Sequence, residues 1–142
     1  MSMNDYKDAL KMGQKAYHES VTHGNYPYLP VLEDIISFTN IESEMTLGIC
    51  EIPIDRIIGT KTAGRTTAFA CNFMPLLEIN SEFSMKWDNL ATALKDEGLR
   101  DPIKVYEYMN YFYVQEGNKR VSVMKFLGSP SIPGNVMCSN TY

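Results

Sequence analysis

The amino-acid sequence predicts an α+β fold in a single chain of domain size. Its 142 residues lie within the roughly 100–150 residues that a typical domain contains. Helical and strand-like periodicities alternate along the chain, which is the pattern of a mixed α+β protein. The hydrophobic fraction of 44% suffices for a buried core. No apolar run reaches the ~18 residues of a membrane span, so no membrane association is expected.

The first element is predicted to be an amphipathic helix. Apolar residues recur at spacings of three and four from Tyr6 to Val21, with charged residues between them. Asn4 or Asp5 is expected to cap its start, and Gly24 to end it.

A break follows at Pro27 and Pro30, and a short second helix is expected from Val31 to Phe38. Its buried side chains are expected to be Leu32, Ile35 and Ile36. Residues 1–46 are thus interpreted as a helical N-terminal extension that packs on a domain of residues 47–142. A docking surface for another protein is the alternative interpretation.

The domain of residues 47–142 is expected to alternate strands and helices around polar turns. The elements expected, in chain order, are a strand over 47–54, a loop over 59–67, a helix from Ser81 to Gly98, strands over 102–107 and 111–115 joined at Met109 and Asn110, a helix from Gly117 to Gly128 and a last strand over 131–136.

Charge argues against a dedicated nucleic-acid-binding surface. The net charge is −4, because residues 1–46 carry three lysines against seven carboxylates while residues 47–142 balance ten basic and ten acidic residues. DNA-binding modules usually present a basic face. This chain alone is therefore expected to bind duplex DNA poorly.

The three cysteines, Cys50, Cys71 and Cys138, are widely spaced and form no CxxC motif. They predict neither a disulfide framework nor a zinc site and fit a reducing, cytoplasmic location. Each is expected to be a small buried residue. His18 and His23 are expected at the surface, and no metal site is predicted.

The stretch from Gly117 to Arg120 is the strongest candidate for an anion site. A strand-like segment ends at Gly117, and Asn118, Lys119 and Arg120 begin the next helix. The free N–H groups and the dipole of a helix N-terminus favour a phosphate. The alternative is an ordinary helix start that Asn118 caps, with two solvated bases.

A second candidate is the loop from Gly59 to Thr67. Lys61, Thr62, Gly64 and Arg65 give it the small and basic side chains of a phosphate-cradling loop. It is not a Walker A motif, because no lysine follows its second glycine. Taken alone, the stretch is also consistent with an ordinary polar loop.

The order of these stretches resembles the N-terminal domain of the bacterial ParB chromosome-partitioning proteins, in the superfamily shared with sulfiredoxin. The resemblance covers about residues 47–137. The matching segments are the first strand and turn over 51–58, Arg65 after the loop, the entry "G-L-x-x-P-I-x-V" over 98–105, the box "V-x-A-G-E-R-R" over 114–120, and the spacing on to Lys125 and Gly128.

The resemblance implies a ParB/sulfiredoxin-like small mixed sheet with packed helices. It also implies a nucleoside triphosphate with Mg²⁺ as ligand, held by the 117–120 turn and Arg65 with the 59–67 loop closing over it. A homodimer is a further expectation. Residues 1–46 resemble the extension of a clostridial-type subgroup. DNA is expected as a partner only with regions beyond this chain, because the family's helix-turn-helix region normally follows the domain.

Asn118 departs from the family pattern. It stands where the box has a glutamate associated with nucleotide hydrolysis and where sulfiredoxins have their catalytic cysteine. An amide cannot act as a general base at neutral pH, so hydrolysis is expected to be slow and sulfiredoxin chemistry is excluded. Glu116 is a weak catalytic candidate; the alternative is an ion pair with Lys119 or Lys125.

Three hypotheses follow for the function. The first is a nucleotide- or phosphate-binding domain that acts as a regulatory or DNA-associated module. The second is a degenerate domain that serves as a protein-interaction scaffold through residues 1–46. The third is a nuclease, small-molecule kinase or weak nucleotide hydrolase of the superfamily, using Glu116 or Asp55 with a divalent metal.

Overall fold

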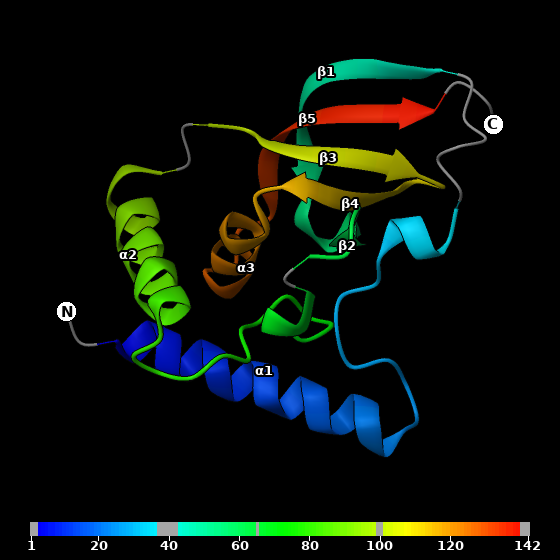
Figure 1. The fold of residues 1–142 in the computed structure, drawn as a ribbon. Coiled ribbons are helices and arrows are strands. Elements are labelled where there is room, and N and C mark those ends of the chain that lie inside the picture. The colour runs from blue at the N-terminus through cyan, green and yellow to red at the C-terminus, as the bar shows by residue number, and fades with distance from the viewer. Residues whose placement is uncertain (1–2, 37–42, 65, 99–100, 140–142) are drawn as a thin grey trace.

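The computed structural model describes residues 3–36, 43–64, 66–98 and 101–139. Its elements, in chain order, are α1 (Asn4–Thr22), η1 (Leu32–Asp34), β1 (Glu44–Pro53), η3 (Ile54–Arg56), β2 (Ile57–Thr60), η4 (Thr66–Ala68), α2 (Glu82–Glu97), β3 (Ile103–Tyr108), β4 (Tyr111–Glu116), α3 (Asn118–Phe126) and β5 (Ser131–Ser139). This α+β composition confirms the predicted fold class (Figure 1).

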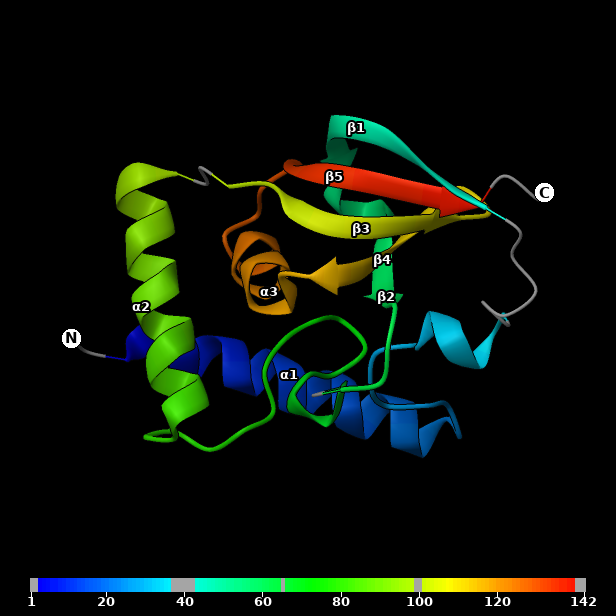
Figure 2. The ribbon, with the colours of Figure 1, turned by 45° about the horizontal axis from the view of Figure 1, so that its top comes forward.

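The strands form one mixed sheet of five, in the order β1-β5-β3-β4-β2. The β1–β5 and β3–β4 pairs are antiparallel, whereas β3–β5 and β2–β4 are parallel. The small edge strand β2 therefore runs beside β4 and ends near the residue at which β4 leads into α3. Figure 2 shows α2 and α3 beside the sheet, with α1 lying across the side away from β1.

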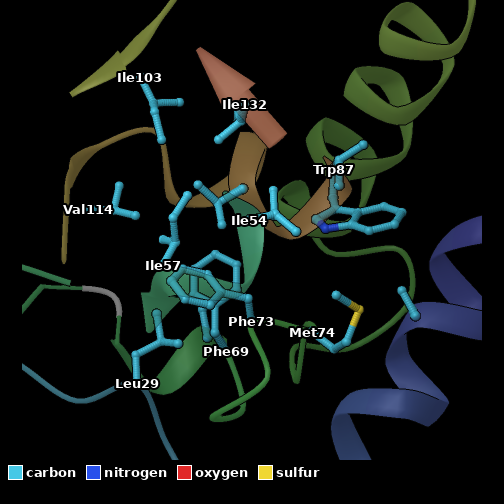
Figure 3. Packing of buried hydrophobic residues seen from close by; sticks show 14 of the residues in the cluster. Leu29, Ile54, Ile57, Phe69, Phe73, Met74, Trp87, Ile103, Val114 and Ile132 are labelled. Carbon is cyan, nitrogen blue, oxygen red and sulfur yellow. The ribbon is translucent and has the colours of Figure 1, made fainter. Parts of the chain in front are cut away.

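The main core lies between the sheet and the three helices. Ile103, Val114 and Ile132 contribute from the strands, and Trp87 contributes from α2 (Figure 3). The Trp87 indole N–H donates to the Ser122 hydroxyl at 2.8 Å and so ties α2 to α3.

A second, smaller cluster covers the other face of the sheet. Tyr106 and Tyr113 follow and precede the core residues Val105 and Val114, so they point to the opposite face. Leu32 of η1 packs on these two tyrosines. The aromatic residues of the hairpin thus cover the sheet.

The N-terminal helix α1 packs on the rest of the chain through its apolar face. Tyr6, Ala9 and Leu10 belong to the main core, and the Tyr6 hydroxyl donates to the Leu77 carbonyl at 2.6 Å. Gly13 allows close approach, since a Cβ there would lie 2.1 Å from the Pro75 carbonyl oxygen. The packing expected of this extension is confirmed, and its boundary at residue 46 stays a prediction.

Three local expectations are wrong. The short helix expected from Val31 is only the 3-10 turn η1, and Ile35 is exposed rather than buried; its expected end at Phe38 lies outside the described residues. The first strand begins at Glu44, three residues before its expected start at residue 47. The segment expected to be a loop from Gly59 contains the end of β2, because Gly59 and Thr60 pair with β4.

The two ends of α2 and the turn between β3 and β4 are set by residues at those positions. The Ser81 hydroxyl accepts from the Ser84 N–H and caps α2, and Gly98 ends α2 with a φ of 75°. Met109 and Asn110 both have positive φ at the hairpin turn, as a two-residue turn requires. The expected capping of α1 is wrong, because Met3 is its N-cap and no side chain caps it.

Two of the three cysteines differ from the expectation that each is buried. Cys138 is buried, whereas Cys50 and Cys71 are exposed, and none of the three is in a disulfide within the described residues. His18 and His23 are exposed, as expected. No helix in the described ranges is long and apolar enough to cross a membrane.

Candidate functional site

The candidate site is built on the junction between β4 and α3. Gly117 adopts φ 117° and ψ 27°, which turns the chain from the strand directly into the helix. A Cβ at this position would lie 2.7 Å from Ile103 Cγ2 and 3.2 Å from Arg120 Nη2. Both the backbone conformation and the lack of space therefore require glycine.

The N-terminus of α3 carries no side-chain cap. Gly117 is the N-cap, and it has no side chain to accept a hydrogen bond from the first turn. Asn118 is the first helical residue, so the alternative interpretation, in which Asn118 caps the helix, is wrong. The first N–H groups of a helix have no acceptor within the helix, and the dipole makes this end positive.

A pocket of about 350 Å³ lies at this helix start, lined by Phe69, Phe83, Gly117, Asn118 and Lys119. The two phenylalanine rings stand edge to face, 5.4 Å apart. The Lys119 ammonium lies 5.2 Å from the centroid of the Phe83 ring. The pocket thus combines an aromatic wall, a cation and a helix N-terminus, and no carboxylate stands among these lining residues.

Hydrogen bonding sets the orientation of the Asn118 amide. The Thr60 hydroxyl donates to the Val114 carbonyl at 3.0 Å, so its oxygen is left to accept. Asn118 Nδ2 donates to that oxygen at 3.4 Å. Asn118 Oδ1 is consequently turned away from Thr60, and it is buried without a hydrogen-bond partner among the described residues.

Arg120 lies beside this pocket but has a structural partner. Its Nη1 donates to the carbonyls of Asp101 at 3.1 Å and Pro102 at 3.4 Å. The guanidinium therefore holds the chain that leads into β3. The sequence places two cations at this turn. Lys119 lines the pocket, whereas Arg120 binds the backbone carbonyls that precede β3.

The 59–67 stretch does not bring its lysine to the pocket. The Lys61 N–H extends the ladder by donating to the Val114 carbonyl at 2.8 Å. The Lys61 ammonium lies 5.4 Å from the centroid of Tyr106, which belongs to the cluster on the opposite face of the sheet. Thr62 and Gly64 are exposed in the turn that follows. Arg65 lies outside the described residues.

Glu116, the weak catalytic candidate, is an exposed strand residue. Its carboxylate lies 3.3 Å from the Lys104 ammonium, and the two side chains are 62% and 58% exposed. The ion pair expected with Lys119 or Lys125 is therefore formed with Lys104 instead. Lys104 stands opposite Glu116 on the neighbouring strand β3, which explains the pairing.

Lys125 lies near the C-terminal end of α3 and connects that end to η3. Its ammonium donates to the Ile54 carbonyl at 3.2 Å and lies 5.2 Å from the centroid of Phe73. Burial lowers the pKa of Lys125, while the nearby Asp55 carboxylate opposes this shift. Asp55 and Lys125 line a second pocket, of about 450 Å³, that shares no residue of those given with the pocket at the start of α3.

Sequence reasoning missed three residues of the site. Phe83 lies within the helix expected from Ser81 to Gly98, and Phe69 lies where no helix or strand is expected. Thr60 was assigned to a loop. A strand at Thr60 could have been suspected, because Thr60 lies between the β-branched Ile57 and Ile58 and the polar turn. For the two phenylalanines, nothing in the local sequence distinguishes a residue of a pocket wall from a core residue.

Metal ligands are not gathered in this region. Among the described residues, no group of three or more His, Cys, Asp or Glu side chains lies close enough to hold a metal ion. Asn118 Oδ1 is the side-chain oxygen that the lining of the α3 pocket offers.

No family model matches the chain, and no curated protein matches it. Solved structures do. A sulfiredoxin from Arabidopsis thaliana is 24% identical with a TM-score of 0.44, over 62% of this chain and 82% of that chain. The chromosome-partitioning protein ParB from Caulobacter crescentus, complexed with CTP-gamma-S, is 16% identical with a TM-score of 0.44, over 63% of this chain and 43% of that chain.

A Pnob8-like ParB-N domain is 13% identical with a TM-score of 0.43, over 69% of this chain and 32% of that chain. These names belong to the superfamily that the sequence motifs resemble. The aligned part spans less than half of each ParB chain. Because the TM-scores lie below 0.5, the function has to be sought in the residues of this chain.

Proposed function

We propose that this protein is a phosphate- or nucleotide-binding module that holds a phosphate group at the start of α3. The observation that carries the proposal is that this helix N-terminus, the Lys119 ammonium and the rings of Phe69 and Phe83 line the same pocket.

The physical argument concerns the balance of charge in the pocket. The amides of the first turn of α3 and the positive end of its dipole attract an anion. Lys119 adds a charge-assisted hydrogen bond, which is stronger than a neutral one. The lining has no carboxylate to repel a phosphate. The pocket therefore favours an anion over a neutral or cationic ligand.

The aromatic wall favours a ligand that is more than a bare phosphate. Phe69 and Phe83 offer ring surface beside the cation, and such surface suits an apolar or planar group. A nucleoside triphosphate meets both demands, since it joins phosphates to a ring. Its proposed role here is that of a regulatory ligand.

The fit to Mg²⁺ is partial. Mg²⁺ is commonly held by one or two carboxylates together with substrate phosphates and waters, and the lining supplies no carboxylate. Asn118 Oδ1 is the side-chain oxygen among the lining residues given, and it is buried. We therefore propose that Mg²⁺ enters with the nucleotide phosphates rather than through protein carboxylates.

The enzyme hypothesis has weaker support. Glu116 pairs with Lys104 at the surface, and Asp55 lies with Lys125 at the other end of α3. The two carboxylates are thus on separate parts of the molecule. The scaffold hypothesis is also weaker, because the apolar face of α1 packs on the core.

The test is calorimetric titration of the protein with ATP, CTP and inorganic phosphate, each with and without Mg²⁺. A hydrogen bond to a charged group contributes ~1.5–3 kcal/mol, so Lys119→Ala is expected to weaken binding by about tenfold or more. Lys61→Ala is the matched control, because Lys61 lies on the other face of the sheet, and it is expected to leave the affinity unchanged.

Two results would overturn the proposal. One is no heat with any of these ligands at millimolar concentration. The other is equal weakening by Lys119→Ala and Lys61→Ala, since that would indicate a diffuse effect of net charge rather than a site at α3.

A further inference from the structure

A separate pocket lies where the N-terminal helix meets the segment before α2. Its volume is about 310 Å³, and its lining residues are Gln14, Tyr17, His18, Tyr28, Thr67 and Leu76. Half of these residues come from α1 and the others from the segments that contact it. None of them lines the pocket at the start of α3, although Thr67 and Phe69 lie two residues apart at η4.

Aromatic rings dominate one side of this pocket. The Tyr17 and Tyr28 centroids are 5.7 Å apart, and the His18 ring stands 5.7 Å from Tyr17 at 86°. Tyr26 is not among the lining residues given, and its ring lies 5.8 Å from that of Tyr28. A hydrogen bond to Tyr17 raises the pKa of Tyr28, so this phenol stays neutral at physiological pH.

The polar groups of the lining are of mixed type. Gln14 contributes an amide, Thr67 a hydroxyl and His18 an imidazole, and each of these groups both donates and accepts hydrogen bonds. Among the residues that the structure describes, the lining contains no Asp, Glu, Lys or Arg. An ionic ligand would lose water here without gaining an opposite charge, so the pocket favours a neutral ligand.

From this combination we infer that the pocket binds a neutral planar heterocycle of one or two rings, such as the base of a nucleoside. Flat π systems pack well on tyrosine rings. A heterocycle with donors and acceptors on its edge matches the amide, hydroxyl and imidazole. The volume lies at the low end for small-molecule sites, which suits a ligand of this size.

The inference gives the N-terminal helix a role beyond packing. The buried face of α1 carries Tyr6, Ala9 and Leu10, whereas Gln14, Tyr17 and His18 lie one turn or more further along and face this pocket. The inference goes beyond the proposed phosphate site and does not depend on it, because the ligand needs no phosphate.

The experiment is a ¹H–¹⁵N correlation titration of the full chain with cytidine, uridine, adenosine and guanosine, and separately with inorganic phosphate. At least one nucleoside is expected to shift amides over 14–18 and around Thr67. Phosphate is expected to shift amides over 117–120 instead. The two proposals therefore fail independently of each other.

Variants sharpen the test. Stacking of a base on an aromatic side chain is worth ~1–3 kcal/mol, so Tyr17→Leu is expected to weaken nucleoside binding at least about fivefold. Gln14→Leu and Thr67→Val remove polar groups from exposed side chains, so they are expected to weaken binding without loss of folding. Tyr111→Leu is the control, because this tyrosine is exposed on the distant β3–β4 hairpin.

The inference is overturned if no nucleoside shifts these amides at millimolar concentration, or if the shifts lie only over 117–120. It is also overturned if Tyr17→Leu lowers the thermal midpoint while Gln14→Leu and Thr67→Val leave binding unchanged. That pattern would mean that Tyr17 and Tyr28 stabilise the packing of the segment after α1 and do not bind a ligand.

Discussion

The two stretches that carry the phosphate-binding signal in the sequence differ sharply in the structure. Both combine glycine, small polar residues and a lysine. In the 117–120 stretch, Lys119 lines a pocket at a helix N-terminus. In the 59–67 stretch, Lys61 faces Tyr106 on the opposite side of the sheet. Similar composition therefore does not indicate a similar role.

The difference arises from the alternation of side chains along β2. Thr60 is buried and reaches Asn118, and Lys61, the next residue, points the other way. The 59–67 stretch thus contacts the candidate site through Thr60 and not through Lys61. In this chain, the basic, glycine-containing stretch that lines the candidate pocket is the one in which α3 begins.

The largest expected contrast is between Gly117 of the one stretch and Gly64 of the other. Gly117→Ala is expected to lower the free energy of unfolding by about 2–4 kcal/mol, from left-handed strain and from overpacking, because a Cβ would lie 2.7 Å from Ile103 at φ 117°. Gly64→Ala is the matched control, since nothing lies within 4 Å of its Cβ position. Urea denaturation measures both.

A change within about 0.5 kcal/mol is expected for Gly64→Ala, as for most surface substitutions. Equal effects of the two alanines would contradict the distinction between a strained junction and an open turn.

A smaller contrast is expected for an added negative charge. Asn118→Asp is expected to weaken phosphate binding about tenfold, the equivalent of ~1.4 kcal/mol, because a carboxylate would stand in the pocket. An acidic residue at a helix N-terminus is favourable, but a carboxylate cannot make the hydrogen bond that Asn118 Nδ2 donates to Thr60. Urea denaturation of the same variant therefore checks that the fold is retained. Thr62→Asp, in the exposed turn, is expected to change phosphate affinity less than twofold. Calorimetry with inorganic phosphate distinguishes the two variants.

The reverse ranking would contradict the proposed position of the anion. If Thr62→Asp weakened phosphate binding more than Asn118→Asp, the exposed turn rather than the start of α3 would be the binding surface.

Much of the fold was predictable, because local chemistry sets it. Ser81 and Gly98 bound α2, and Met109 with Asn110 makes the hairpin turn. Elements that tertiary contacts define were not predictable. The sequence around Gly59 and Thr60 is small and polar and predicts a loop, and these two are strand residues because β4 lies beside them.

The site was predictable in part for the same reason. Gly117 and Lys119 lie within one stretch of sequence, where a strand that ends in glycine indicates the helix start. Phe69 and Phe83 are far from it in sequence and resemble core residues, which both also are. Arg120 looks like a phosphate ligand, and only the carbonyls of Asp101 and Pro102 show its structural use.

The smallest expected effect concerns Glu116, and it separates binding from catalysis. A positioned general base contributes about 10²–10⁴ in rate, and Asn118, at the pocket, cannot act as one at neutral pH. Glu116 is 62% exposed and paired with Lys104, so Glu116→Gln is expected to change neither nucleotide affinity nor turnover. Phosphate release from ATP and CTP is expected near background in the parent and in Glu116→Gln, with a gain only in Asn118→Glu. Robust turnover in the parent that Glu116→Gln abolishes would instead identify an enzyme whose base lies at the end of β4.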